Sequence, residues 1–186
     1  MTVKYQYYLR TAEAVSGAVR ILDNLINELI DVLDQEARVY ENILRMSKNK
    51  TNIIVGGKVV ELDNIVKLEQ SLVLQMGRLE KLREELVEKL AREIGIKSLE
   101  VTISELMKHT DPERAQRLKA CQDKLRTTVN ELKDTNGVNA KLIQNSLEYI
   151  NFSMNLIATA DVGNNNYGNK GKVNDSKKRS LFDVKL

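Results

Sequence analysis

The sequence predicts an all-α protein, an antiparallel and coiled-coil-like bundle of three long helices with a short extra helix and a disordered basic C-terminal tail. The composition is the first reason: Leu, Ile, Val, Glu and Lys dominate the 186 residues, and Pro112 is the single proline. Aromatic residues make up 4% of the chain and tryptophan is absent, so the core must be aliphatic, as in narrow seams between helices. In addition, three long stretches carry apolar residues at steps of three and four, the period of one helix face.

The first long helix is predicted from Thr11 to Met46. One face of it is apolar except for Glu36, and this face consists of Ala18, Leu22, Leu25, Leu29, Val32, Glu36, Val39, Ile43 and Met46. Apolar neighbours widen the stripe on both flanks, so the helix should contact more than one other helix.

A connector with two glycines follows the first helix. In "TNIIVGGKVVELDN", short β-branched runs flank Gly56 and Gly57. Two residues between such runs indicate a hairpin, because paired glycines accept the positive φ angles of tight hairpin turns. We therefore expect a small β-like or extended connector, with a flexible loop as the alternative.

The second long helix is predicted from Leu62 to Ile94, and Gly95 stands where a left-handed residue ends a helix. "TISE", from Thr102 to Glu105, matches a capping box and starts a short helix. Asp111 followed by Pro112 is a strong start signal, since it places an N-cap carboxylate before a proline at the first helical position.

The last helix is predicted from Pro112 to about Ala160. Its stripe consists of Leu118, Leu125, Val129, Leu132, Asn136, Asn139, Ile143, Leu147, Ile150, Met154 and Ile157. We expect a helical domain over residues 1–160 and a flexible basic tail over residues 161–186, because the tail is rich in Asn, Gly, Lys and Ser and cannot bury enough apolar surface to order itself.

The tail holds six Lys or Arg against three Asp, which accounts for the whole net charge of +3. Its run from Lys177 to Arg179 could contact nucleic acid through phosphates. Three consecutive charges are few, so a solvated tail is the favoured interpretation and nucleic acid is not an expected partner.

An enzyme is not expected, and no catalytic residue, metal site or cofactor is predicted. A di-metal carboxylate centre needs Glu-x-x-His pairs on bundle helices, whereas His109 is the single histidine. Cys121, the single cysteine, is interpreted as a small buried hydrophobe, and its isolation fits a reducing cytoplasm. There is no signal-peptide pattern and no apolar stretch of about 18 residues, so we expect a cytoplasmic protein without membrane insertion.

Two amides, Asn136 and Asn139, occupy the predicted buried face of the last helix. A seam asparagine fixes helix register, because any other alignment leaves an amide buried without a hydrogen bond. In a purely structural interpretation, the two residues bond to each other or to Glu36 or Gln75. In a functional interpretation, they mark the end of the core seam and the beginning of a partner-binding surface.

Helix lengths favour such a surface. At about 1.5 Å per residue, the second helix covers an antiparallel last helix only to the neighbourhood of Gln144. Apolar residues beyond that point would lack a third helix against them and call for a partner, unless the connector at residues 51–60 covers them. The predicted cargo-binding residues are Ile143, Leu147, Ile150, Met154 and Ile157.

Three segments resemble the FlgN family of flagellar export chaperones. "TNGVNAKLIQNSLEYINFSMNLI" is similar to the family's C-terminal signature, in which Asn-x-x-Asn-x-x-Leu precedes an amphipathic helical end. "LEQSLVLQMGRLEKLREEL" resembles the middle helix, and "YGNKGK", from Tyr167 to Lys172, resembles a Tyr-Gly-x-x-Gly segment. The resemblance spans about Leu22 to Lys172, while the "IIVGGKVV" connector and the "RSLFDVKL" ending depart from the family pattern.

The resemblance implies a cytoplasmic chaperone that holds the helical C-terminal segments of hook-filament junction proteins before secretion. It also implies that Tyr167 helps to dock the loaded chaperone on the cytoplasmic domain of the export gate. Weak self-association is compatible with this role. The alternative from another class is a homo-oligomeric coiled-coil adaptor that self-associates through the same stripe.

Overall fold

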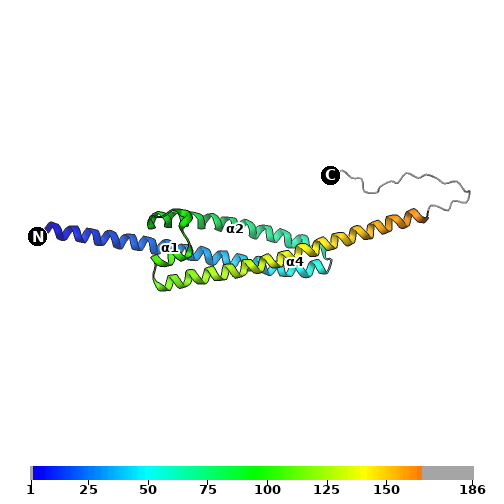
Figure 1. The fold of residues 1–186 in the computed structure, drawn as a ribbon, viewed down its shortest axis with the longest axis horizontal. Helices are drawn as coiled ribbons and strands as arrows, with labels where there is room; N and C mark the ends of the chain where they lie inside the picture. Colours follow the sequence, from blue (N-terminus) through cyan, green and yellow to red (C-terminus); the bar gives the residue numbers. More distant parts are fainter. Residues whose placement is uncertain (1, 165–186) are drawn as a thin grey trace, which may run out of the picture. The chain divides into compact units, whose positions relative to one another are not determined.

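The computed structural model describes the backbone of residues 2–164, and the side chains of residue 17 and residues 19–159. Three long helices dominate: α1 (Thr2–Val55), α2 (Val59–Ile94) and α4 (Pro112–Asn164) (Figure 1). Between α2 and α4, the short helix α3 (Ile103–Leu106) lies between the 3₁₀ turns η1 (Ser98–Glu100) and η2 (Met107–His109). Residues 2–164 contain no strand, which confirms the predicted all-α class.

The chain forms two compact units, Met1–Leu142 and Ile143–Leu186, and the boundary lies within α4. The first unit holds α1, α2, α3 and the first part of α4. The predicted division at residue 161 stays a prediction, since most of the tail, residues 165–186, lies outside the described part of the chain.

Helices α1 and α2 pack closely against each other in opposite directions. Lys50 pairs with Glu69 at 2.6 Å, and Glu36 pairs with Arg83 at 2.9 Å. As the residue number falls along α1, the number of its partner on α2 rises. This is the pairing of an antiparallel helical hairpin.

Helix α1 and the first part of α4 run in the same direction. Cys121 Sγ donates a hydrogen bond to Asp34 Oδ1 at 3.2 Å, and Ser47 Oγ donates to Asn136 Oδ1 at 2.7 Å. Here the residue numbers rise together along the two helices. The side chains of α1 thus set the register of both of its long neighbours.

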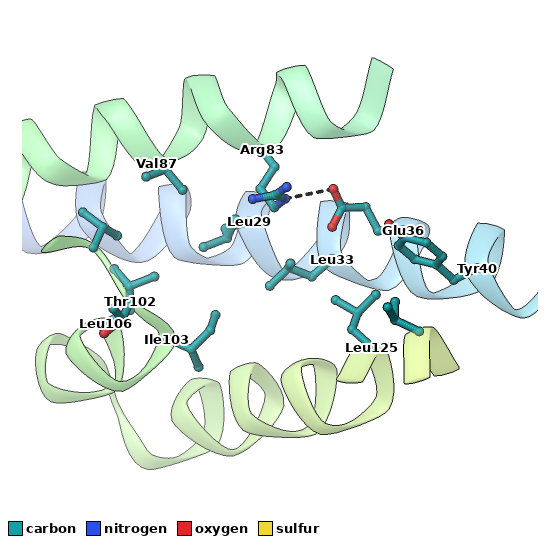
Figure 2. Close-up of a pocket in the computed structure, with 12 residues that line it drawn as sticks. Leu29, Leu33, Glu36, Tyr40, Arg83, Val87, Thr102, Ile103, Leu106 and Leu125 are labelled. Carbon is teal, nitrogen blue, oxygen red and sulfur yellow. Dashed lines mark hydrogen bonds and ion pairs between the residues drawn. The ribbon is translucent and has the colours of Figure 1, made fainter. Parts of the chain in front are cut away.

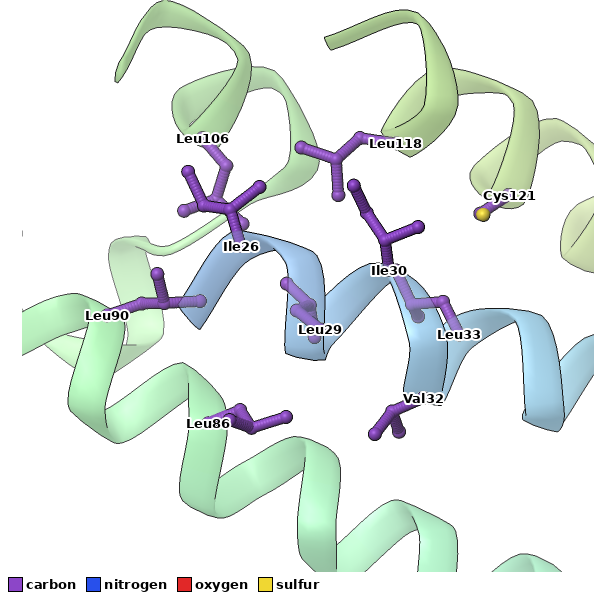
Figure 3. Packing of buried hydrophobic residues seen from close by; sticks show 10 residues of the cluster. All are labelled: Ile26, Leu29, Ile30, Val32, Leu33, Leu86, Leu90, Leu106, Leu118 and Cys121. Atoms are coloured by element: carbon purple, nitrogen blue, oxygen red, sulfur yellow. The ribbon is translucent and has the colours of Figure 1, made fainter. Parts of the chain in front are cut away.

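The core of the first unit is aliphatic, as predicted. One cluster draws on α1, α2, α3 and α4 and consists of Ile26, Leu29, Ile30, Val32, Leu33, Leu86, Leu90, Leu106, Leu118 and Cys121, whose side chains point toward one another in Figure 3. A second cluster joins Val39 and Ile43 of α1 to Leu79 of α2. The wide apolar stripe predicted for the first helix is confirmed, because the buried residues of α1 contact more than one neighbouring helix.

The glycine connector is a turn between two helices, so the predicted β-like connector is wrong, and so is the flexible-loop alternative. Helix α1 continues past its predicted end to Val55, and Gly57 takes a φ of +64°. The N–H groups of Gly57 and Lys58 donate to the carbonyls of Ile54 and Ile53 at 3.0 and 3.1 Å, which is the pattern of a glycine-capped helix end. Ile53 is buried, so packing outweighs the modest helix penalty of β-branched residues.

Three other predicted helix boundaries, at Gly95, Thr102 and Asp111, are confirmed in their chemistry. The remaining predicted bounds were too narrow, because α1 begins at Thr2, α2 begins at Val59 and α4 ends at Asn164. Gly95 has a φ of +80°, and its N–H donates to Ala91. Thr102 Oγ1 accepts from the N–H of Glu105 at 3.1 Å, as the capping box requires. At the start of α4, Asp111 Oδ1 accepts from the N–H of Arg114 at 2.9 Å, and this bond lowers the pKa of Asp111 below its ordinary value.

The buried face of α4 differs from the predicted stripe by one residue at two places. Thr128 is buried while Val129 is 39% exposed, and Asn136 is exposed. A threonine can face inward here because its hydroxyl is satisfied within its own helix, Thr128 Oγ1 donating to the carbonyl of Lys124 at 2.9 Å. Cys121, predicted as a small buried hydrophobe, lies in the main core cluster.

Candidate functional site

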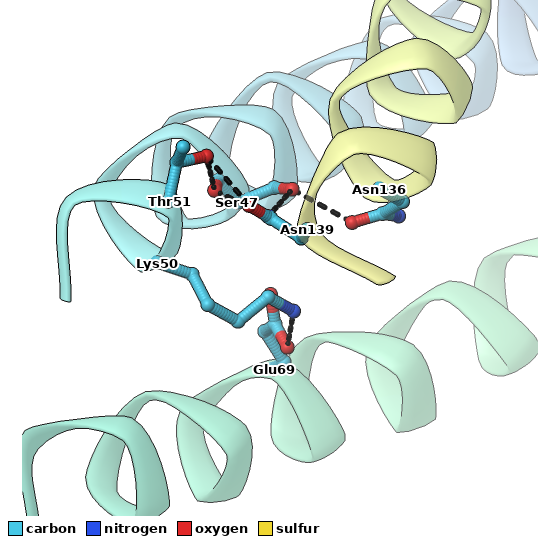
Figure 4. A network of polar contacts seen from close by, with 6 residues as sticks. All are labelled: Ser47, Lys50, Thr51, Glu69, Asn136 and Asn139. Atoms are coloured by element: carbon cyan, nitrogen blue, oxygen red, sulfur yellow. Dashed lines mark hydrogen bonds and ion pairs between the residues drawn. The ribbon is translucent and has the colours of Figure 1, made fainter. Parts of the chain in front are cut away.

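A polar layer links α1 to α4 near the end of the first unit (Figure 4). Asn139 is 2% exposed and Ser47 is fully buried. The amide nitrogen of Asn139 donates to the carbonyl oxygen of Ser47 at 2.9 Å and to its Oγ at 3.2 Å. Its amide oxygen accepts from Thr51 Oγ1 at 2.7 Å. Every polar atom of the Asn139 side chain therefore has a partner, as a buried amide requires.

Asn136 takes part in the same layer from outside the core. It is exposed, and it accepts the hydroxyl proton of Ser47 at 2.7 Å. The predicted partners were wrong: the two amides bond to Ser47 and Thr51 of α1, and not to each other, to Glu36 or to Gln75. The two asparagines do form a polar layer, but its other members are the hydroxyls of Ser47 and Thr51 on α1. These two residues were not predicted, because a search for apolar stripes does not select serine or threonine.

The predicted cargo-binding residues begin directly after this layer, in the unit Ile143–Leu186. Their side chains are between 37% and 70% exposed, and they are Ile143, Leu147, Ile150, Met154 and Ile157. At spacings of four and three they share one face of α4. The predicted exposure of these apolar side chains agrees with the structure, whereas their role in binding stays a prediction.

A second apolar flank was missed by sequence reasoning. Tyr149, Phe152 and Leu156 are between 54% and 72% exposed and follow one another at spacings of three and four, so they form their own stripe on the helix. Their spacing in the sequence could have revealed this stripe. It was overlooked because the first apolar stripe was already enough to predict a helix over these residues. Between residues 143 and 159, Glu148 is the single charged side chain.

The remaining predicted site residue, Tyr167, lies outside the described residues, as does the tail run from Lys177 to Arg179. In the described part of the chain, no cluster of His, Cys, Asp and Glu could hold a metal ion. None of the described helices is long and apolar enough to cross a membrane.

Cys121 has the environment of a core residue. Burial raises the pKa of its thiol to about 11, and the hydrogen bond to Asp34 and the charge of that carboxylate act in the same direction. The thiolate is the nucleophilic form, and a raised pKa disfavours it at neutral pH.

These features define an all-α protein with an aliphatic core held in register by a polar layer, and with a helix that carries two exposed apolar flanks and a single charged side chain between residues 143 and 159. Residues 25–175 match the family described as FlgN protein. The match covers most of the chain, so the chain belongs to the FlgN family, a family of flagellar export chaperones and not of enzymes.

A relative among curated proteins is also similar to this chain over most of its length. The uncharacterized protein YvyG of Bacillus subtilis (strain 168) is 26% identical over 159 residues, which cover 84% of this chain and 96% of the relative. No solved structure matches the chain.

Proposed function

We propose that this protein is a cytoplasmic chaperone of flagellar export that binds the helical C-terminal segments of hook-filament junction proteins, prevents their premature assembly and delivers them to the export gate. Membership of the FlgN family supports the chaperone role. The observation that carries the choice of site is the run of exposed apolar side chains on α4 between residues 143 and 159.

The chemistry of this run suits a helical client. An amphipathic helix buries its apolar face in a partner's groove through side chains at helical spacing, and each fully covered Leu, Ile or Phe contributes about 1.5–3 kcal/mol. With two flanks exposed, residues 143–159 offer a client more apolar area than one stripe would. The scarcity of charge lowers the desolvation cost of covering them.

The first unit supplies the support in this proposal. In this proposal α1, α2 and the first part of α4 act as one helical bundle, and the Ser47–Asn139 contact joins α1 to α4 at a point in the sequence shortly before the client-binding residues.

The test compares two double variants with the same change of charge. Ile150→Asp with Met154→Asp places two carboxylates on the predicted binding face, whereas Asn151→Asp with Asn155→Asp places them about 100° further around the same helix, on a polar face. We expect the first variant to lose capture of a purified junction-protein C-terminal segment and the second to retain it. Both should keep the wild-type melting temperature within a few degrees.

Two outcomes would contradict the proposal. Unfolding of the Ile150 and Met154 variant alone would identify these side chains as core residues. A wild-type protein that stays homo-oligomeric in light scattering when client is added, instead of forming a 1:1 complex, would favour the coiled-coil adaptor.

A further inference from the structure

The first unit contains a pocket that is separate from the polar layer and from residues 143–159. Its volume is about 330 Å³, and its walls come from α1, α2, α4 and the segment that includes α3 (Figure 2). Most of its lining is aliphatic, including Leu33, Val87, Ile103 and Leu125. Val129 also lines it and is 39% exposed, so this part of the lining borders solvent.

One carboxylate lies in this apolar wall. Glu36 is 4% exposed, and its Oε1 accepts from Arg83 Nε at 2.9 Å. Its second oxygen, Oε2, has no hydrogen bond among the contacts of the described residues, and Figure 2 draws no interaction from it to the other pocket residues. Of the described residues, only Thr110 has a fully enclosed side-chain oxygen or nitrogen without a partner. Oε2 is therefore not fully enclosed, and Glu36 is one of the residues that line the pocket.

We propose that this pocket binds an aromatic side chain of a partner protein that carries a hydrogen-bond donor, namely tyrosine or tryptophan, with the donor bonded to Glu36 Oε2. The volume is ample, because a cavity of about 150 Å³ holds a benzene ring. The polar residues of the lining are Glu36, Arg83, Tyr40 and Thr102, and a mainly aliphatic pocket with a few polar groups is typical of a site that orients an amphipathic group.

The Glu36–Arg83 pair selects a neutral donor. Arg83 already balances the charge of Glu36, so a second cation would gain little, and an incoming carboxylate would be repelled by the carboxylate of Glu36. A phenol or indole needs only the free acceptor oxygen and buries its ring against the aliphatic wall. The inference goes beyond the proposed client site, since it uses none of the residues between 143 and 159.

Two isomeric probes test the chemistry on the full chain. 4-Methylphenol and anisole have the same atoms, but only the first carries an O–H donor. We expect 4-methylphenol to shift the methyl NMR signals of Leu33, Val87, Ile103 and Leu125 in a saturable way, with a dissociation constant on the order of 1 mM. Anisole should bind at the same methyl groups about tenfold more weakly, because it cannot bond to the carboxylate.

Variants separate the anchor from the cavity. Glu36→Met should abolish the preference for 4-methylphenol, whereas Glu69→Met, which removes the other α1–α2 carboxylate pair, should leave it unchanged. If Glu36→Met does not fold, Val129→Phe decides, because a ring at the mouth of the pocket should remove binding of both probes.

The proposal is overturned if the two probes bind equally to the wild type, if the shifts lie away from the pocket, or if Val129→Phe binds both normally. A change of oligomeric state in Val129→Phe would also overturn it, since the occupant would then be a second copy of this chain.

Discussion

The side-chain amide of Asn139 on α4 donates two hydrogen bonds to Ser47 on α1, one to the carbonyl oxygen at 2.9 Å and one to the hydroxyl at 3.2 Å. One of the two acceptors is a backbone carbonyl of α1 and the other is a side-chain hydroxyl. The contact therefore ties α4 to the backbone of α1 as well as to one of its side chains. A shift of α4 by one helical turn would leave the buried amide without these partners, which makes Asn139 a determinant of register.

Asn139→Leu is therefore expected to destabilise the protein by about 1–3 kcal/mol, the cost of leaving buried polar partners unsatisfied. Ser47 and Thr51 would each lose a hydrogen bond in the variant. The matched control is Asn136→Leu, which also removes a bond to Ser47 but from an exposed position, and it should cost less than about 1 kcal/mol. Urea unfolding measures both, and an Asn139→Leu protein as stable as the wild type would show that the layer does not hold the register.

Local signals predicted the helix ends that carry a capping residue, because a cap involves only neighbours in sequence. Gly95, Thr102 and Asp111 each take the predicted capping role. The prediction for the connector was wrong because the same two glycines suit either a hairpin or a helix end. The deciding factor is the packing of Ile53, which is a tertiary contact. Glycine pairs identify a turn; what they join depends on the neighbouring helices.

The polar layer was only partly predictable for a similar reason. Asn139 was placed correctly, whereas Asn136 was assigned to the buried face because its spacing continues the apolar stripe through Val129. The stripe was already misplaced at Val129, because the neighbouring Thr128 is the residue that faces inward there. A count of apolar residues overlooks threonine and serine, whose hydroxyls are satisfied by their own helix or by an asparagine opposite.

Gly57→Ala should destabilise the protein, because an alanine at a φ of +64° is strained by about 1 kcal/mol or more. A Cβ at this position meets no atom within 4 Å, so backbone strain is the only cost. Gly77→Ala within α2 also adds a Cβ into open space but at an ordinary helical conformation, and it should stabilise by about 0.5–1 kcal/mol. Opposite signs in thermal unfolding are expected, and a stabilised Gly57→Ala would contradict the left-handed turn.

The raised pKa of Cys121 predicts a specific loss of stability in alkaline solution. The thiol titrates near pH 9.0 when unfolded and near 11 when folded, so between these values the folded state holds a proton that the unfolded state has released. Its contribution to stability is complete below about pH 9 and is lost as the pH rises through 11. After allowance for solvent screening, the loss is on the order of 1 kcal/mol.

Cys121→Ala isolates this effect, because tyrosines and lysines that titrate in the same range are common to both proteins. The variant should be less stable at pH 7, from the lost packing, but its free energy of unfolding should fall less between pH 9 and 11. Parallel pH curves for the two proteins would show that the thiol does not titrate in the folded state as described.

Gate docking and client binding are predicted to use different tyrosines. Tyr167, in the "YGNKGK" segment outside the described residues, is the only tyrosine after Tyr149, and the resemblance of this segment to the family's Tyr-Gly-x-x-Gly pattern assigns it to the export gate. Tyr149 is 72% exposed on the second apolar flank of α4. An exposed aromatic ring with a hydroxyl can fill a partner's pocket and bond at its rim, so each tyrosine is a plausible anchor for its own partner.

Tyr167→Ala should leave the purified chaperone–client complex intact while weakening its binding to the cytoplasmic domain of the gate by about tenfold or more, as for an interface anchor worth at least about 1.4 kcal/mol. Tyr149→Ala, the matched change, should weaken client capture and leave gate binding unchanged, because its side chain lies among the apolar residues that the client is proposed to cover. Calorimetric titration of each variant with each partner measures all four affinities. Loss of client binding in Tyr167→Ala, or of gate binding alone in Tyr149→Ala, would refute the division of labour between the two residues.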